Sequence, residues 1–561
     1  MSDIAAEGAG SLAGGGSNTL QRKIDWTGAF WVASGVPALV LFSIGAIAAT
    51  VGKPSWLVWT LSISFGFIQA FTYAEIAGLF PHKSGGASVY GAVAWVRYSK
   101  FIAPISVWCI WFAWSPVLAI GSGLASGYIL GALFPADAAI NTWQVTLLDL
   151  SFIKSGLLLR INATFVLGVV LLLGVFAIQH GGILRSARTT MILGITALVP
   201  LMLIALVPLL SGDLPSDHFS PMLPIAHDAA GHVVDGEWNM AGITLMAGGL
   251  FIAAWSTYGF ETAVCYTREF RDPKRDTFKA ILFCGLLCIM VFTLVPLAFQ
   301  GHMGLGKLVT EAVLDDAGAV VTPAVYDGML SPDIYSGMGV ANAMSQMVGG
   351  GEVVANVLVV MLVLAVLLSI MTSMAGSSRT LYQASVDGWL PRYLSHVNEH
   401  GAPTRAMWTD LGFNLILLML SDYVFVLAAS NVGYIIFNFL NLNSGWIHRL
   451  DRPNWARPFR APTIILAVGA VLSFVNLALM GLGADIYGAG TLTAGLVFAS
   501  LIIPVFLYRH YVQDKGVFPQ EMAEDMHIGD DDGVKRAGVL PYVVLAAGVL
   551  VVIIANKMAV Y

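Results

Sequence analysis

The sequence predicts an all-α protein that crosses a membrane many times, and three observations indicate this fold class. Hydrophobic residues make up 57% of the 561 residues and charged residues only 11%, whereas soluble domains carry about 25% charged residues. The apolar runs reach about 20 residues, which suits a helix that spans a bilayer and not the short alternating strands of an outer-membrane barrel. Two of these runs are interrupted near the middle, at residues 33–37 and 255–259, as in transporters with broken helices.

Apolar windows of about 20 residues predict twelve to thirteen transmembrane helices. Their expected ranges are 27–51, 55–79, 101–134, 158–178, 187–210, 241–267, 278–300, 353–384, 406–420, 423–446, 464–481, 488–508 and 539–558.

The predicted helices suggest how the chain is organised. Residues 1–24 are rich in Gly, Ser and Ala and are expected to form a disordered cytoplasmic tail. Residues 25–512 form the predicted twelve-helix core, which divides into a first repeat, a second repeat and two further helices at 27–210, 241–446 and 464–508. A polar cytoplasmic connector follows at 513–538, and residues 539–561 hold the thirteenth helix.

The basic residues predict the orientation, because cytoplasmic segments carry an excess of Lys and Arg. With the N-terminus in the cytoplasm, 23 of the 28 Lys and Arg residues fall in inside segments. The five expected outside are Lys53, Lys154, Arg160, Lys307 and Lys557. We therefore expect a multi-pass protein of the cell membrane, surrounded by the lipid bilayer, with the long connections 211–240 and 301–352 outside.

Composition and motifs argue against several other classes of protein. The sequence has no basic stripe that would suggest a nucleic-acid partner. Its four cysteines lie in or beside apolar runs, which favours packing over a metal site or a disulfide framework. No HExxH motif, phosphate-binding glycine loop or nucleophile–His–acid set indicates an enzyme. We therefore expect no catalytic residues, no metal and no cofactor.

The two interrupted helices provide a candidate solute site. The first contains Ala33-Ser34-Gly35-Val36-Pro37, where Pro removes a hydrogen-bond donor and Gly lowers the cost of irregular backbone. The sixth contains Trp255-Ser256-Thr257-Tyr258-Gly259. Two five-helix halves that each begin with a broken helix predict an inverted-repeat transporter. Free N–H groups would face a carboxylate and unwound carbonyls an ammonium, so the paired breaks predict a site for a zwitterion.

Five motifs resemble those of the amino acid–polyamine–organocation transporters, over about residues 25–510. They are Ser34–Val36, Glu75–Tyr90, Gly259–Glu261 with Asp272–Arg275, Arg379–Pro391 and Arg457–Pro462. Ala33 stands where the family usually has a glycine. The resemblance implies a LeuT-like 5+5 inverted repeat that works by alternating access. It also implies substrate contacts from Ala33, Ser34, Gly35, Val36, Trp255, Ser256, Thr257 and Gly259.

Trp255 and Glu261 are the candidates for gating and coupling. Trp255 resembles the aromatic gate of the arginine–agmatine exchanger group, where the indole covers the solute, and a cation would gain about 0.5–2 kcal/mol from it. Packing against a neighbouring helix is the alternative role. Glu261 is the one carboxylate well inside an apolar run of the first ten helices, and a charge there costs at least about 2.5–3.5 kcal/mol. A coupling proton is one interpretation, and a structural hydrogen bond is the other. Glu75 and Asp410 lie near predicted cytoplasmic helix ends, where we expect water to reach them.

The coupling ion stays open between a proton and sodium, with a counter-substrate as the third choice. Thr372-Ser373 resembles the Thr-Ser pair that ligates sodium in related symporters, which makes it a candidate cation site. Ordinary contacts between helices are the alternative role for these hydroxyls.

The main hypothesis for function is a permease, either a symporter or an antiporter, for an amino acid or a related amine. A polyamine transporter or exchanger is the second hypothesis, but a dication without a carboxylate would need more acid than Glu261 supplies. A sensor or scaffold that keeps a transporter fold without transporting is the third. The oligomeric state stays open.

Overall fold

The computed structural model describes residues 20, 22–135, 137–212, 214–314, 320–527 and 535–561. Within these residues, twelve helices are long and apolar enough to cross a membrane. They are α2 (Trp26–Val32) with η1 (Val36–Leu39) and α3 (Val40–Val51), α4 (Ser55–Gly78), α6 (Ile102–Trp114) with α7 (Val117–Leu133), α9 (Ala163–His180), α10 (Ile183–Ser211), α11 (Met240–Thr257) with η3 (Gly259–Glu269), α12 (Pro273–Met303), α15 (Gly351–Val386), α17 (Tyr423–Asp451), α18 (Thr463–Gly483) with η6 (Ala484–Tyr487), α19 (Thr491–Ser500) with α20 (Ile502–Leu507) and η7 (Tyr508–Gln513), and α22 (Leu540–Met558). The predicted all-α membrane class is confirmed.

Shorter helices connect or flank these spans. They are α5 (Ala87–Trp95), α8 (Ala139–Thr142), α13 (Pro332–Tyr335), α14 (Val340–Val348), α16 (Thr404–Leu418) and α21 (Gln520–His527), with 3₁₀ turns η2 (Ser216–His218), η4 (Gly328–Leu330) and η5 (Arg392–Ser395). The predicted helix at 406–420 corresponds to α16, which has only 15 residues. It is too short to count among the twelve spans.

The described parts of the connections contain four small antiparallel sheets. They pair β1 (Gln144–Asp149) with β2 (Leu158–Asn162), β3 (Ile225–His227) with β4 (Val233–Asp235), β5 (Leu308–Thr310) with β8 (Val325–Tyr326), and β6 (Val313–Leu314) with β7 (Val320–Thr322). The prediction that a helix starts at residue 158 is wrong, since residues 158–162 form β2. The helix starts at Ala163 because the side chain of Asn162 caps it, accepting from the Phe165 N–H at 2.9 Å.

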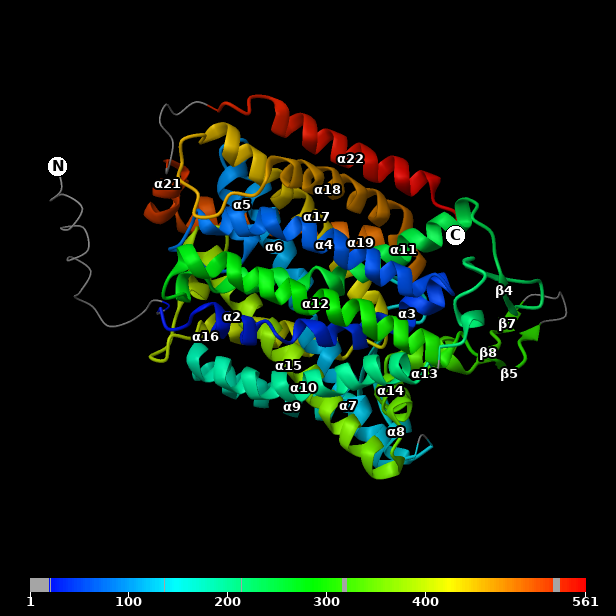
Figure 1. The fold of residues 1–561 in the computed structure, drawn as a ribbon. Helices are drawn as coiled ribbons and strands as arrows, with labels where there is room; N and C mark the ends of the chain where they lie inside the picture. The colour runs from blue at the N-terminus through cyan, green and yellow to red at the C-terminus, as the bar shows by residue number, and fades with distance from the viewer. Residues whose placement is uncertain (1–19, 21, 136, 213, 315–319, 528–534) are drawn as a thin grey trace, which may run out of the picture.

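The long helices lie side by side in one bundle with two distinct ends. Figure 1 shows α21 at one end, and β4, β5, β7, β8 and the C-terminus at the other. The first spanning segment is 94% buried over its most apolar part, against 17% for α22. Trp26–Val51 therefore runs through the centre of the bundle, and α22 lies at its edge. Residues 1–19 and 21 of the predicted tail and residues 528–534 of the predicted connector lie outside the described residues.

Both predicted broken helices are present. In the first, residues 33–35 separate α2 from η1. In the second, the break comes later than expected. Ser256 and Thr257, predicted to be unwound, belong to α11, which ends at Thr257 with Tyr258 as its C-cap. From there the backbone changes to 3₁₀ bonding, with the Glu261 N–H donating to the Tyr258 carbonyl at 3.2 Å. Five spans run from α2 to α10. From α11 to α17, apart from the short helices α13 and α14, there are four spans (α11, α12, α15 and α17) and the shorter α16. This order agrees with the predicted five-plus-five arrangement.

Candidate functional site

The gap between α2 and η1 leaves backbone groups without helical partners, and hydroxyl groups of α15 bind them. Thr372 donates to the carbonyl of Val32 at 2.6 Å and accepts from the N–H of Gly35 at 3.2 Å. Ser369 donates to the carbonyl of Gly35 at 2.7 Å. Unwound backbone inside a bilayer must be satisfied by protein or by water. These two hydroxyls therefore hold the break against α15.

Gly35 is required at this contact for reasons of space. A Cβ atom at Gly35 would lie 2.5 Å from the carbonyl oxygen of Leu368 and 2.5 Å from Oγ1 of Thr372. Its φ of −76° is one that any residue can adopt. The glycine thus permits a close approach of two backbones rather than an unusual turn.

The two breaks face each other. The hydroxyls of Ser43 and Ser256 are 3.0 Å apart, and Ser256 also donates to the Leu39 carbonyl at 3.4 Å. A Cβ atom built on Gly259 would lie 3.2 Å from Cγ1 of Val36. The structure therefore brings Ser256 and Gly259 of the second broken helix against the first one.

The remaining predicted substrate contacts differ in where they point. Ala33 is buried beside the break, and its carbonyl accepts from the Val36 N–H. The Ser34 hydroxyl faces Gly194 of α10, since a Cβ there would lie 2.7 Å from Oγ. Thr257 lies within hydrogen-bond distance of Ser62 of α4, at 2.7 Å. Thr257 thus faces α4, and its role as a substrate contact stays a prediction.

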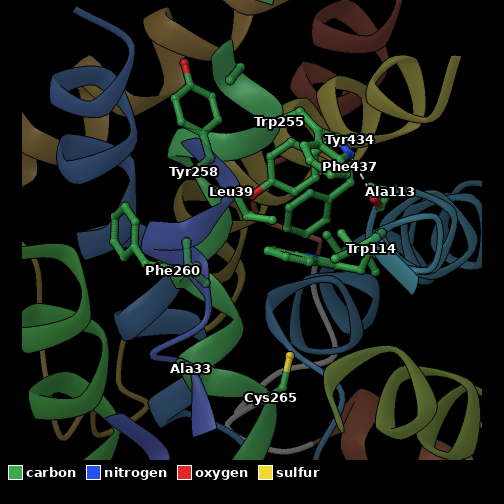
Figure 2. Packing of buried hydrophobic residues seen from close by; sticks show 14 of the residues in the cluster. Ala33, Leu39, Ala113, Trp114, Trp255, Tyr258, Phe260, Cys265, Tyr434 and Phe437 are labelled. Carbon is green, nitrogen blue, oxygen red and sulfur yellow. Dashed lines mark hydrogen bonds between the residues drawn. The ribbon is translucent and has the colours of Figure 1, made fainter. Parts of the chain in front are cut away.

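Trp255 lies between α6 and α3, the part of the first broken helix that follows η1. Its indole N–H donates to the Ala113 carbonyl at 2.9 Å, and its ring centroid is 5.9 Å from that of Phe42. Figure 2 shows Trp255 grouped with Trp114 and Tyr434 beside the breaks. With 3% of its surface exposed, Trp255 closes this region on the side of α6.

Glu261 lies in η3, just past the second break, with only one of its two oxygens hydrogen-bonded. Oε1 accepts from the indole N–H of Trp114 at 3.1 Å. Oε2 is buried and has no hydrogen-bond partner among the described residues. Trp114 in turn packs edge-on against Tyr434, with centroids 6.3 Å apart. A buried carboxylate with an unsatisfied oxygen is costly.

The predicted cation site at Thr372 and Ser373 is made of hydroxyls that already join helices. Thr372 binds Val32 and Gly35, and Ser373 donates to the Trp114 carbonyl at 2.5 Å. These hydroxyl and carbonyl oxygens are the kind of ligand that a hard cation prefers. Across the described part of the chain, no group of three His, Cys, Asp or Glu residues is placed to hold a metal ion.

Comparison with known proteins identifies the family. The family model described as amino acid permease matches residues 24–507. The chain belongs to the amino acid permease family. The matched segment begins just before α2 and ends with α20, so both broken helices and α15 lie inside it.

Curated relatives of this permease are transporters from plants and a bacterium. The Polyamine transporter PUT1 of Oryza sativa subsp. japonica is 24% identical over 474 residues, which is 82% of this chain and 75% of the relative. The chloroplastic Cationic amino acid transporter 9 of Arabidopsis thaliana is 24% identical over 290 residues, 51% of this chain and 46% of the relative. The Branched-chain amino acid permease BcaP of Bacillus subtilis (strain 168) is 20% identical over 487 residues, 86% and 87% of the two chains.

The permease has a buried amide cluster beside the second break that the sequence reasoning missed. Asn438 of α17 donates to Gln69 at 2.5 Å and to Tyr73 at 2.7 Å, both on α4. Asn476 of α18 donates to Asn438 at 2.9 Å and accepts from the Tyr258 hydroxyl at 3.0 Å. The cluster holds the end of α11 against three other helices. Amide side chains in the middle of apolar runs could have indicated this cluster, because polar groups inside a membrane cost free energy unless they have partners.

Two carboxylates of the permease are more buried than their sequence positions suggested. Glu75 is paired with Arg449 at 2.5 Å and with Arg457 at 3.1 Å. Asp410 accepts from Ser115 at 2.5 Å and also from Ser377 and Trp111. The expectation that water reaches both is wrong, because packed helices cover Glu75 and Asp410 to 1% and 0% exposure.

Proposed function

We propose that this permease is a secondary active transporter that moves an amino acid or a related amine across the cytoplasmic membrane by alternating access. The observation that supports it most is the contact of Gly35 with Ser369 and Thr372. The inner part of the first broken helix is held to α15 by hydroxyl groups rather than by continuous helix. Such a contact can open and close without unwinding regular structure.

The backbone at the breaks provides the recognition chemistry. When α2 moves away from α15, the N–H of Gly35 loses Thr372 as its acceptor and becomes a donor for a substrate carboxylate. The N–H of Ser34, which donates to the Trp31 carbonyl at 3.2 Å, would join it once that turn also opens. The carbonyls of Val32 and Gly35 become acceptors for an ammonium group. Both groups of a zwitterion are then satisfied by the same short segment.

Trp255 and Glu261 provide the lid and the coupling group of this proposal. Trp255 lies against Phe42 and Ala113, so rotation of its ring would uncover the space beside Ser256 and Gly259. Glu261 is positioned to carry a proton, because one of its oxygens already lacks a partner among the described residues. Sodium at Thr372–Ser373 and exchange against a counter-substrate remain the other coupling modes to be tested.

A polyamine is the second candidate substrate, favoured by the relative named as a polyamine transporter. Of the acids at the two breaks, Glu261 alone is close to the candidate contacts, and a polyamine would present at least two cations to it. Asp410 is already bonded to three donors. An amino acid, which brings its own carboxylate, fits this charge balance better.

Uptake into proteoliposomes tests the proposal. Labelled amino acids and amines are offered to the purified protein with a pH gradient, a sodium gradient or internal counter-substrate varied in turn. We expect the proteoliposomes to accumulate more of an amino acid than protein-free vesicles do. A pH gradient, a sodium gradient or internal counter-substrate should drive this accumulation. Protein that binds a ligand but never moves it would instead support a sensor or scaffold.

The variant Glu261→Gln separates coupling from binding. If Glu261 carries the proton, this variant keeps counterflow between equal pools but loses its response to a pH gradient. Glu352→Gln, at an exposed carboxylate near the start of α15, is the matched control and should behave as wild type. A Glu261→Gln variant that still responds to the pH gradient would remove Glu261 from the coupling step.

The orientation is part of the same proposal, with the end that carries α21 in the cytoplasm. Single cysteines at Arg22 and Lys557 test it, because the four native cysteines are buried. In intact cells, a membrane-impermeant thiol reagent should label only the cysteine at 557. Labelling of the cysteine at 22 would show that the orientation is the opposite of the proposed one.

A further inference from the structure

A cavity of about 230 Å³ opens at the end of the bundle where the chain enters α2. Its walls come from the segment that leads into α2, from α2 itself, from α10 and from Arg271, which lies two residues after the end of η3. The residues that carry the argument are Lys23, Asp25, Trp31, Arg188, Met191 and Arg271. None of them belongs to the contacts between the two breaks and α15.

The cavity has a strong excess of positive charge. Lys23, Arg188 and Arg271 all line it, and none of them forms an ion pair with a carboxylate of the described residues. The one acid in the wall, Asp25, is already used as the cap of α2. It accepts from the Thr27 hydroxyl at 2.6 Å and from the Gly28 N–H at 3.0 Å. Three cations around one small space repel each other, and an anion between them would remove that repulsion.

One side of the cavity is apolar and leads to the lipid-facing surface. Trp31 and Met191 form this side, and Met191 has 39% of its surface exposed. Further along α10, Ile192 and Ile195 are 63% and 53% exposed. Large apolar side chains exposed on a membrane-spanning helix face hydrocarbon chains. A ligand here would have its anionic group among the three cations and its apolar part along α10.

We propose that this cavity binds the phosphate of an anionic phospholipid from the predicted cytoplasmic leaflet. Basic pockets between transmembrane helices on the cytoplasmic side are suited to acidic headgroups. The apolar wall of Trp31 and Met191 favours a lipid over a free phosphate ion. The site stands independently of the proposed transport function, since binding can be measured without any substrate.

The lipid would add a second link between the start of α2 and α10, which already pack together where Trp31 and Ser34 face Gly194. The N–H groups of Lys23 and Ile24 donate to the Glu269 carbonyl, and the Arg271 N–H donates to the Ile24 carbonyl at 2.7 Å. Lys23 and Arg271 are thus fixed to one another through the backbone, whereas Arg188 belongs to α10. A phosphate bound by all three holds the start of α2 to α10 and stabilises the conformation described here.

Native mass spectrometry and thermal unfolding of the full-length protein test this site. The protein is purified in detergent and supplied with phosphatidylglycerol or phosphatidylcholine of the same acyl chains. We expect retention of phosphatidylglycerol and a higher unfolding temperature with it than with phosphatidylcholine. The triple variant Lys23→Gln, Arg188→Gln, Arg271→Gln should lose this preference by about tenfold or more.

A matched control removes the same number of charges elsewhere on the same end. Lys274→Gln, Arg405→Gln and Arg460→Gln change exposed residues outside the cavity and should leave the preference intact. Arg188→Gln alone changes one exposed side chain and should give an intermediate loss, which keeps the test valid if the triple variant does not fold. The proposal would be overturned if the wild type retained the two lipids equally. It would also be overturned if the control variant lost the preference for phosphatidylglycerol as much as the triple variant does. Stabilisation by inorganic phosphate or glycerol 3-phosphate as large as that by phosphatidylglycerol would overturn the assignment to a lipid.

Discussion

Lys83 and Asp525 form a buried ion pair, with Nζ 2.7 Å from Oδ2. Lys83 follows α4 and Asp525 lies on α21, so the pair joins the connector to the transporter core. Asp387, directly after α15, also accepts from Lys83 at 2.5 Å. His82 completes the cluster at 2.7 Å from Asp525. Three segments far apart in the sequence are thus held together at the end of the bundle that we expect to be cytoplasmic.

The charges of this cluster stabilise one another. Burial alone would lower the pKa of Lys83, but the charges of Asp387 and Asp525 outweigh it, and the pKa is raised. Burial alone would raise the pKa of Asp525, but the hydrogen bond from His82 and the charge of Lys83 outweigh it, and the pKa is lowered. Both groups are charged at neutral pH. The contribution of Asp525 is therefore present above about pH 4, the ordinary range for Asp, and is lost as the pH falls through its lowered pKa.

Replacing Lys83 by Met should destabilise the protein strongly. The change leaves Asp387 and Asp525 buried without their cation, and removal of one partner from a buried pair costs about 3–5 kcal/mol. The free energy of unfolding is measured by titration with dodecyl sulfate. Arg392→Met is the control, because Arg392 pairs with Asp514 but has 64% of its side chain exposed, and its loss should cost about 1 kcal/mol or less. Equal effects of the two changes would contradict a special role for Lys83.

Gly35→Ala should abolish uptake while the protein still purifies as a single folded species. Its Cβ would lie 2.5 Å from both Leu368 and Thr372, so α2 could no longer close against α15. Gly412→Ala is the matched control, since no atom lies within 4 Å of a Cβ built there. Uptake is measured in proteoliposomes with whichever labelled amino acid or amine the wild-type protein accumulates. Normal uptake by Gly35→Ala would show that the close approach is not needed in the transport cycle.

Trp255→Ala should reduce uptake at least tenfold, and Trp255→Phe should reduce it less. The alanine removes both the ring beside Phe42 and the hydrogen bond to Ala113, whereas phenylalanine keeps an aromatic ring. Trp408→Ala serves as the control, because Trp408 is 53% exposed on α16. Unchanged uptake by Trp255→Ala would leave Trp255 with a packing role only.

The contact between the two long connections that follow α10 and α12 should weaken as the pH rises. His232 is 2.6 Å from Glu311 and 3.3 Å from Asp228. The hydrogen bond with Glu311 and the charges of both acids raise the pKa of His232. A raised pKa means that this contact is complete below about pH 6.5, the ordinary value for His, and is lost as the pH rises through the raised pKa.

Hydrogen exchange measures this change in the segment that contains β4. After correction for the intrinsic rate, exchange at residues 228–236 should be faster at pH 8.5 than at pH 5.5. His232→Gln should remove the difference, because glutamine keeps its hydrogen-bonding groups without the charge. A variant with the same pH response as wild type would exclude His232 as its cause.

The sequence predicted the breaks because their cause is local. Pro37 and Gly35 weaken a helix wherever they stand, so the interruption after Val32 could be placed to within a residue or two. The end of α11 is different, since it depends on Asn476, which holds the Tyr258 hydroxyl from another helix. No local pattern around Ser256 contains that information.

Burial was harder to predict than secondary structure. Asp410 lies near the start of a short helix, which suggested contact with water. Its partner Ser115 lies in the turn between α6 and α7, and its partner Ser377 lies on α15. Only the packed bundle brings these residues together. The bonds of Thr372 to Val32 and Gly35 likewise join residues 340 and 337 positions apart. The sequence indicated Thr372-Ser373 as a cation site or a helix contact, but it could not give the partners.

The hydroxyl bonds at Gly35 bear on how fast this carrier can turn over. A hydroxyl changes its acceptor by rotation about one side-chain torsion, which takes picoseconds to nanoseconds, whereas movements of whole helices take microseconds to milliseconds. The bonds from Ser369 and Thr372 therefore add little to the activation barrier for moving α2. Separation of Lys83 from Asp387 would expose or strand buried charges, which is a far larger barrier. If the transport cycle separates these two residues, its slow step is expected at the end of α15 beside α21 and not at the bonds of Ser369 and Thr372.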